Sequence, residues 1–174
     1  MYVSIRNKGS GWKKTIALLM FIIYSISALW LVLIGRLYIR TYQYLTLGST
    51  RNVYVFTPEN TSTFFNFSYW KLNINLIPFE TIKLYFFGAD YIDKHIIVSN
   101  LLGNVILFLP FGLLPIFLRQ LKSKRKFLIV SIATVLSIEI LQFVLQVGMA
   151  DIDDVILNLL GAIIGYSFYY AVIK

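Results

Sequence analysis

Four long apolar runs constrain this chain more than any other feature of its sequence. They occupy residues 15–34, 96–118, 127–147 and 155–173, and the first two carry no charged residue. A helix needs about 20 mostly apolar residues to cross the hydrocarbon core of a bilayer. Inside lipid the backbone must satisfy its own hydrogen bonds, so each run is predicted to be a helix. We therefore predict an all-α membrane helix bundle with four transmembrane helices, forming a single domain over residues 1–174.

The composition supports a membrane protein and excludes several kinds of site. Hydrophobic residues make up 58% of the 174 residues and charged residues 14%, against about 45–50% and 25% in soluble domains. There is no cysteine, which excludes disulfides, cysteine zinc sites, iron–sulfur clusters and a thiol nucleophile. The single histidine, His95, argues against a histidine-rich metal site and against a Ser-His-Asp triad. No cofactor is expected.

The basic residues predict the orientation of the bundle. Residues 119–126, between the second and third runs, include five Lys or Arg, whereas residues 148–154, between the third and fourth, have none and carry three aspartates. Lys and Arg near span ends prefer the cytoplasmic side, so residues 119–126 and both termini are predicted to lie inside. The net charge of +8 then reflects topology and contact with anionic lipids, and no nucleic-acid partner is expected.

Between the first two runs lies a long segment, residues 35–95, which this topology places outside. It is rich in aromatic residues, which suit the headgroup layer. Residues 72–89 approach a fifth apolar run, but Glu80 and Lys83 lie near its centre and would each cost about 2.5–3.5 kcal/mol in the membrane. An interfacial or re-entrant segment is predicted there.

Polar residues inside the runs are costly and are therefore candidates for function. In the fourth run and its lead-in, polar residues and glycines follow one another at steps of 3, 4, 3 and 4, which places them on one helical face. Similar spacing joins polar residues in the second and third runs, all nearer the predicted outer side. We predict an outward-facing polar pocket among these three spans, lined by Asn100, Asn104, Glu139, Gln142, Asp151, Asp154 and Asn158. The alternative is that these side chains hydrogen-bond one another and only specify helix packing.

Small residues and prolines predict how the spans meet. Gly161 and Gly165 form a GxxxG pattern that allows close approach of a neighbouring helix, either another span such as the third or a partner chain in an oligomer. Pro110, Gly112 and Pro115 should kink the inner half of the second run.

Four blocks of sequence, in order, resemble the VanZ-like family. They are residues 75–82 (NLIPFETI), residues 100–112 (NLLGNVILFLPFG), Glu139 with Gln142, and residues 151–161 (DIDDVILNLLG). The residues that carry the family motif are Asn75, Pro78, Phe79, Pro110, Gly112, Asp153 and Gly161. The resemblance implies a multi-pass protein of a bacterial cytoplasmic membrane, linked to the cell envelope and to resistance to the glycopeptide teicoplanin. One departure stands out: the family often has an arginine just before its D-x-D-D block, and residues 148–150 hold none.

Three functions fit these residues. The favoured one is non-enzymatic binding of membrane lipids, a cell-wall lipid precursor, a glycopeptide or another amphiphilic drug in the polar pocket. A second is a metal-assisted enzyme on a lipid-linked substrate, with Asp151, Asp153 and Asp154 as candidate ligands of Mg²⁺ or Ca²⁺ beside Glu139. The third is an accessory subunit that docks through its glycine face. No nucleophile is visible, so no catalytic residue is assigned.

Overall fold

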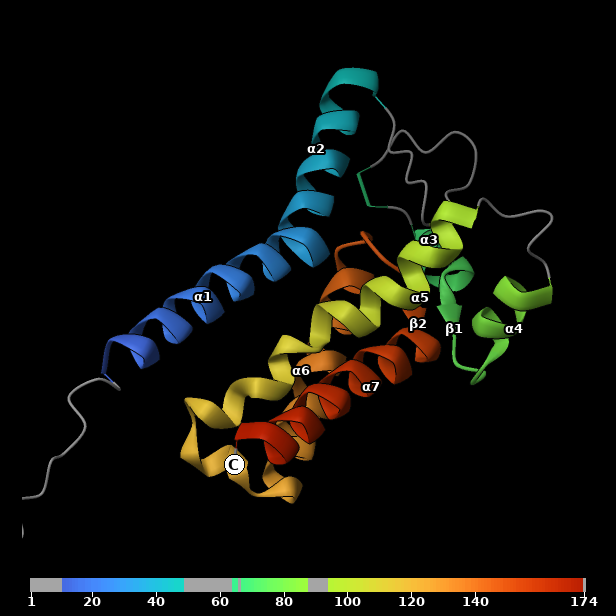
Figure 1. Cartoon of the computed structure of the whole chain (residues 1–174). Coiled ribbons are helices and arrows are strands. Elements are labelled where there is room, and N and C mark those ends of the chain that lie inside the picture. Colours follow the sequence, from blue (N-terminus) through green and yellow to red (C-terminus); the bar gives the residue numbers. More distant parts are fainter. Residues whose placement is uncertain (1–10, 49–63, 66, 88–93, 174) are drawn as a thin grey trace, which may run out of the picture.

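A computed structural model describes residues 11–48, 64–65, 67–87 and 94–173 of the chain (Figure 1). Its elements are helices, three 3₁₀ or π segments that extend them, a short 3₁₀ turn and one pair of two-residue strands. In chain order they are α1 (Gly11–Leu29), the π segment η2 (Trp30–Ile34), α2 (Gly35–Leu47), α3 (Phe67–Leu72), β1 (Ile74–Asn75), α4 (Glu80–Phe87), α5 (Lys94–Phe108), the 3₁₀ helix η3 (Pro110–Ile116), the 3₁₀ turn η4 (Arg119–Lys122), α6 (Lys124–Val144), β2 (Ala150–Asp151), α7 (Ile152–Phe168) and the π segment η5 (Tyr169–Ile173).

Within the described ranges, four helical stretches are long and apolar enough to cross a membrane: Thr15–Leu47, Ile97–Ile116, Lys124–Val144 and Ile152–Val172. This confirms the predicted all-α bundle with four spans. The first boundary was wrong, because the helix does not end at residue 34 but continues through η2 and α2. It ends at Gly48, whose left-handed backbone (φ 64°) and N–H bond to the Tyr44 carbonyl close the last turn.

Among the described residues, the closest packing of two segments joins α7 to α5 and η3, which run side by side in Figure 1. A Cβ atom added to Gly161 would overlap the backbone carbonyl of Val105, and one added to Gly165 would overlap that of Leu109. A Cβ atom added to Gly112 of η3 would likewise overlap the backbone carbonyl of Ala162. The glycine face therefore packs on the second span rather than the third, and the chain itself occupies the face that the sequence suggested for a partner.

The prolines reshape the second span as predicted. After Phe108 the α-helix gives way to a 3₁₀ helix that starts at Pro110 and contains Pro115. Proline lacks the N–H that an α-helix needs, and the tighter 3₁₀ turn keeps the chain helical. This change brings Gly112 against α7.

An aromatic cluster packs α6 against α7 and the second span, at the end of the bundle that holds η4. The rings of Phe127 and Tyr166 stack with centroids 4.1 Å apart, and Phe108 and Val135 are buried beside them. The hydroxyl of Tyr166 donates to the carbonyl of Lys122 in η4. This end, which carries the basic residues 119–126, is called the basic end below.

α1 lies apart from this body, projecting away from it in Figure 1. Most of its large apolar side chains are exposed, Ile26 by 65%. Its links to the second span include the ring contact of Phe21 with Phe117 (5.3 Å) and a hydrogen bond from the Tyr24 hydroxyl to the Leu107 carbonyl.

The opposite end of the bundle, called the strand end below, holds α3, β1, β2 and α4. β1 and β2 pair in parallel, with Ile74 opposite Ala150 and Asn75 opposite Asp151. The segment predicted at residues 72–89 is thus a strand and a short helix, α4, packed near the start of α7; its last two residues lie outside the described part of the chain. At eight residues, α4 is too short to span the core.

Candidate functional site

Three spans bring four of the predicted polar residues together. Asn158 of α7 donates from Nδ2 to Oε1 of Glu139 on α6 over 3.4 Å. One turn earlier on α7, Asp154 accepts from Nδ2 of Asn104 on α5 over 2.6 Å. The side chains of Glu139 and Asn158 are buried, with 6% and 3% of their surface exposed. Polar side chains from α5, α6 and α7 therefore lie together at a similar depth in the bundle, as predicted. We call this group the carboxylate cluster: Asn104, Glu139, Asp154 and Asn158.

Two acceptor atoms of this cluster have no hydrogen-bond partner among the described residues. They are Oε2 of Glu139 and Oδ1 of Asn158. Buried polar atoms almost always have a partner, and an unpaired one costs about 1–3 kcal/mol. Both atoms are acceptors, so the group that completes the cluster must bring a proton or a positive charge.

Asn100 and Gln142 lie near the cluster but bind other segments. Asn100 donates to the hydroxyl of Tyr85 on α4 over 2.5 Å, and burial raises the pKa of that hydroxyl. Gln142 donates to the carbonyl of Val32 over 2.7 Å. Val32 lies in the π segment η2, where Gly35 N–H bonds the Trp30 carbonyl. Gln142 thus holds the first span in place and is not a member of the carboxylate cluster.

Asp151 and Asp153 organise the strand end. Asp151 caps α7 by accepting from the N–H of Asp153 over 2.9 Å, and it also accepts from Thr81 and Asn75. Burial raises the pKa of Asp151, and these hydrogen bonds oppose the shift. Asp153 accepts from the backbone N–H groups of Phe79 (2.5 Å) and Ile82 (3.0 Å).

These two bonds explain why the chain tolerates an unusual backbone before α4. Phe79 has φ 66°, a left-handed conformation that costs a non-glycine residue roughly 1–2 kcal/mol. The Asp153 carboxylate holds it and caps the first turn of α4. Both oxygens of Asp153 are thereby used by backbone groups.

The three aspartates named as candidate metal ligands under the alternative, enzymatic function have separate partners among the described residues. The part of the chain that the structure describes contains no group of three or more His, Cys, Asp or Glu side chains placed to hold a metal ion. Asp151 and Asp153 bind the 75–82 segment, while Asp154 points to Asn104. The three neighbouring aspartates therefore have different hydrogen-bond partners.

Arg36 and Arg40 of α2 belong to this region, and both fall in the segment 35–95 that the predicted topology placed outside as a loop. Arg40 is 3% exposed and donates to both the backbone carbonyl (2.7 Å) and Oε1 (2.9 Å) of Gln146, and also to the Phe64 carbonyl. Gln146 has φ 56° at the end of α6, so Arg40 fixes a turn that usually takes glycine. Arg36 and Arg40 are four residues apart, which places them on one face of a helix. This spacing is the feature of the sequence that could have indicated that they act together.

Arg36 supplies positive charge next to the carboxylate cluster. Its Nη1 donates to the Val147 carbonyl over 3.5 Å, and it interacts electrostatically with both Glu139 and Asp154. Residues 148–150 lack the arginine common in the resembling family, and here a cation reaches the same turn from α2.

A cavity of about 400 Å³ opens between the first span and α5. The polar residues that line it are Arg36, Ser99, Asn100 and Asn104, and Trp30 also contributes. Asn104 lines the cavity and bonds Asp154, so it lies between the cavity and the rest of the carboxylate cluster. We call it the polar cavity.

Comparison with known proteins identifies the family. The family described as VanZ/LLP1 matches residues 21–173, which include most of the first span and the whole of the other three. The chain belongs to the VanZ/LLP1 family. With its four apolar helices, this makes it a multi-pass membrane protein, as the resemblance in its motifs implied.

The chain is also similar to a curated relative. Protein VanZ from Enterococcus faecium is 32% identical over 104 residues, which cover 59% of this chain and 56% of that protein. The match thus spans a little over half the length of the relative. No solved structure matches the chain.

Proposed function

We propose that this VanZ/LLP1-family protein binds an amphiphilic envelope molecule, a lipid-linked cell-wall precursor or a teicoplanin-type glycopeptide, in the polar cavity and the adjoining carboxylate cluster. The observation that carries the proposal is the pair of buried, unpartnered acceptors, Glu139 Oε2 and Asn158 Oδ1. They require a donor, such as a hydroxyl or amine.

The charges around the cavity favour a ligand with both polar groups and an anionic group. Arg36 lines the polar cavity and attracts an anion, while the buried carboxylate of Glu139 accepts a donor. Precursors and glycopeptides both combine hydroxyls with ionised groups. The membership of the VanZ/LLP1 family supports a link to glycopeptide resistance.

The test compares two substitutions of the same kind. Glu139→Gln removes the acceptor charge and nearly keeps the shape, and the control Glu80→Gln makes the same change at an exposed residue of α4. Cells producing wild type or Glu80→Gln should tolerate teicoplanin equally, and cells producing Glu139→Gln should be as susceptible as cells without the protein. Envelope lipids of the same strains should change only with Glu139→Gln.

Immunoblots of membranes must show equal amounts of each variant. Unchanged teicoplanin tolerance and unchanged lipids in Glu139→Gln cells would refute the proposal. The carboxylate cluster would then serve only helix packing.

The proposal requires the strand end to face outward and the basic end to face the cytoplasm. The difference in basic residues between residues 119–126 and 148–154 supports that orientation. Because the chain has no cysteine, Ile77→Cys at the strand end and Ser123→Cys at the basic end can each be labelled alone; both sites are exposed. An impermeant maleimide should label Ile77→Cys in intact cells and Ser123→Cys only after lysis. The reverse pattern would place the polar cavity on the cytoplasmic side.

A further inference from the structure

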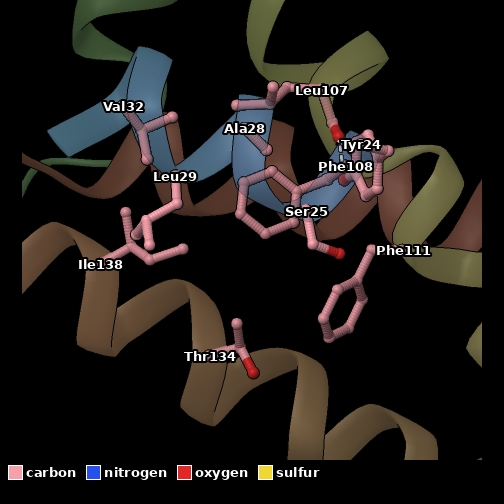
Figure 2. Close-up of a pocket in the computed structure, with 10 residues that line it drawn as sticks. All are labelled: Tyr24, Ser25, Ala28, Leu29, Val32, Leu107, Phe108, Phe111, Thr134 and Ile138. Atoms are coloured by element: carbon pink, nitrogen blue, oxygen red, sulfur yellow. Dashed lines mark hydrogen bonds between the residues drawn. The ribbon is translucent and has the colours of Figure 1, made fainter. Parts of the chain in front are cut away.

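Between α1 and the body of the bundle lies an apolar cleft of about 260 Å³ (Figure 2). Three elements wall it: α1 with Tyr24 and Ala28, the second span with Phe108 and Phe111, and α6 with Thr134 and Ile138. Figure 2 shows side chains from all three walls projecting toward one space. Beside the cleft, α1 meets the second span through the large side chains of Phe21 and Tyr24.

The cleft continues the polar cavity. Val32 and Leu107 line both spaces, so the polar cavity and the cleft share a wall along the first and second spans. Gln142 fixes that wall by its bond to the Val32 carbonyl. A second apolar groove, of about 330 Å³, begins at Tyr24, which also lines the cleft, and continues along η3 to Phe117.

The polar cavity, the cleft and the second groove form a row. A charged side chain lines the polar cavity at one end, and apolar side chains line the other two spaces. Arg36, Asn100 and Asn104 line the first space, while the second and third are lined almost wholly by apolar side chains. From Leu107 to Phe117 the second span advances roughly 15–20 Å at helical rises of 1.5–2.0 Å per residue. That is at least half of the core thickness of about 30 Å, so the row matches one chain of a membrane lipid.

We infer that the cleft between α1 and α6 holds one hydrocarbon chain of a phosphate-bearing lipid whose headgroup lies in the polar cavity beside Arg36. This deepens the proposed function, on which it rests, by assigning the ligand class: a lipid phosphate, and not a soluble peptide. The positive charge of Arg36 selects the phosphate, and the cavity amides donate to its other polar groups.

The first experiment maps where a lipid chain lies. The full chain is placed in phosphatidylcholine nanodiscs that contain a small fraction of phosphatidylglycerol carrying a photoreactive diazirine midway along one acyl chain. After irradiation, adducts should be about tenfold more frequent at Phe111, Thr134 and Ile138 than at exposed Ile26, which corresponds to about 1.4 kcal/mol of preference. Unlabelled phosphatidylglycerol should compete for the cleft adducts and leave those at Ile26 proportional to the bulk probe.

Matched variants separate a specific site from ordinary lipid contact. Ala28→Trp fills the cleft, whereas Ser27→Trp adds the same side chain at an exposed neighbour on α1. Cleft adducts should disappear in Ala28→Trp and persist in Ser27→Trp. Arg36→Gln should reduce them about tenfold if the headgroup is held there. A diacylglycerol probe with the same chain but no phosphate should show no preference for the cleft.

The outcomes distinguish this inference from the proposed function. Uniform adducts, or equal preference for diacylglycerol, would overturn the lipid-phosphate site even if Glu139→Gln still abolished teicoplanin tolerance. Saturable cleft adducts that depend on Arg36, found together with a fully active Glu139→Gln variant, would support the lipid site and overturn the proposed role of the carboxylate cluster.

Discussion

The first and last spans of this protein are both apolar helices, yet they pack in opposite ways. α7 touches α5 and η3 backbone to backbone through Gly161, Gly165 and Gly112. α1 meets the same second span through the ring of Phe21 and the hydroxyl of Tyr24, and cavities lie beside it. In lipid, apolar side chains gain little by leaving one apolar solvent for another, so close packing depends on small residues. The close contact fixes the carboxylate cluster in place, while the loose one leaves room for a ligand.

The largest effect should come from adding one methyl group to the α7 contact. Gly161→Ala forces its Cβ into the Val105 carbonyl and should cost about 3 kcal/mol of stability, with a sharp loss of folded yield in detergent. Gly103→Ala on α5 is the control, since a Cβ there meets no described atom within 4 Å. Thermal unfolding of the two purified variants measures the difference. Equal yields and melting temperatures would mean that α5 and α7 can separate without loss.

The second-largest effect on stability should distinguish Asp153 from the adjacent Asp154. Asp153→Asn weakens the carboxylate that holds Phe79 and Ile82 and should cost about 1.5–3 kcal/mol, the range for hydrogen bonds to charged groups. Asp154→Asn keeps an oxygen for Asn104, so it should fold like wild type and lose teicoplanin tolerance. Limited proteolysis of the 75–87 segment, read by mass spectrometry, should detect opening only in Asp153→Asn. Opening in both variants would show that Asp154 is structural too.

A smaller effect is expected where α1 is attached. Tyr24→Phe removes the hydrogen bond to the Leu107 carbonyl and should cost about 1 kcal/mol. Tyr38→Phe, at a 62% exposed position of α2, is the matched control and should be neutral. Chemical unfolding in the same detergent compares them. A neutral Tyr24→Phe would indicate that α1 contributes no stability to the body through this contact.

The smallest effect should follow a change on the outer face of α1. Ile26→Ala, at a 65% exposed residue, should alter stability by less than about 0.5 kcal/mol. Val135→Ala in α6, where the side chain is fully buried, should cost clearly more because it leaves a cavity. If the two substitutions cost the same, α1 is packed against something beyond this chain.

The sequence was most informative where a helix must bury a polar group. Asn104, Glu139, Asp154 and Asn158 follow helical spacing within apolar runs, so their convergence was predictable from periodicity and depth. The pairing partner of the glycine face was not predictable, because a GxxxG pattern states that a helix comes close without naming which one.

Arg40, Tyr85 and the two-residue strands lay beyond sequence reasoning for another reason. Their partners are 106, 15 and 76 residues away along the chain and show no periodic relation to them. The end of the first span was also misplaced, since the uninterrupted apolar run stops at residue 34 and charged residues follow it. A charged side chain can instead remain in a helix when carbonyls such as that of Gln146 receive it.

The pairing of Asn75 with Asp151 also sets an order for making this protein. The 75–82 segment is synthesised 76 residues before the aspartates that hold it. At a translation rate of about 5–20 residues per second, that gap lasts roughly 4–15 s. During this interval the left-handed turn at Phe79 and the short helix after it have no carboxylate to stabilise them. The strand end therefore forms last, once residues 150–153 have been synthesised and can bind the 75–82 segment.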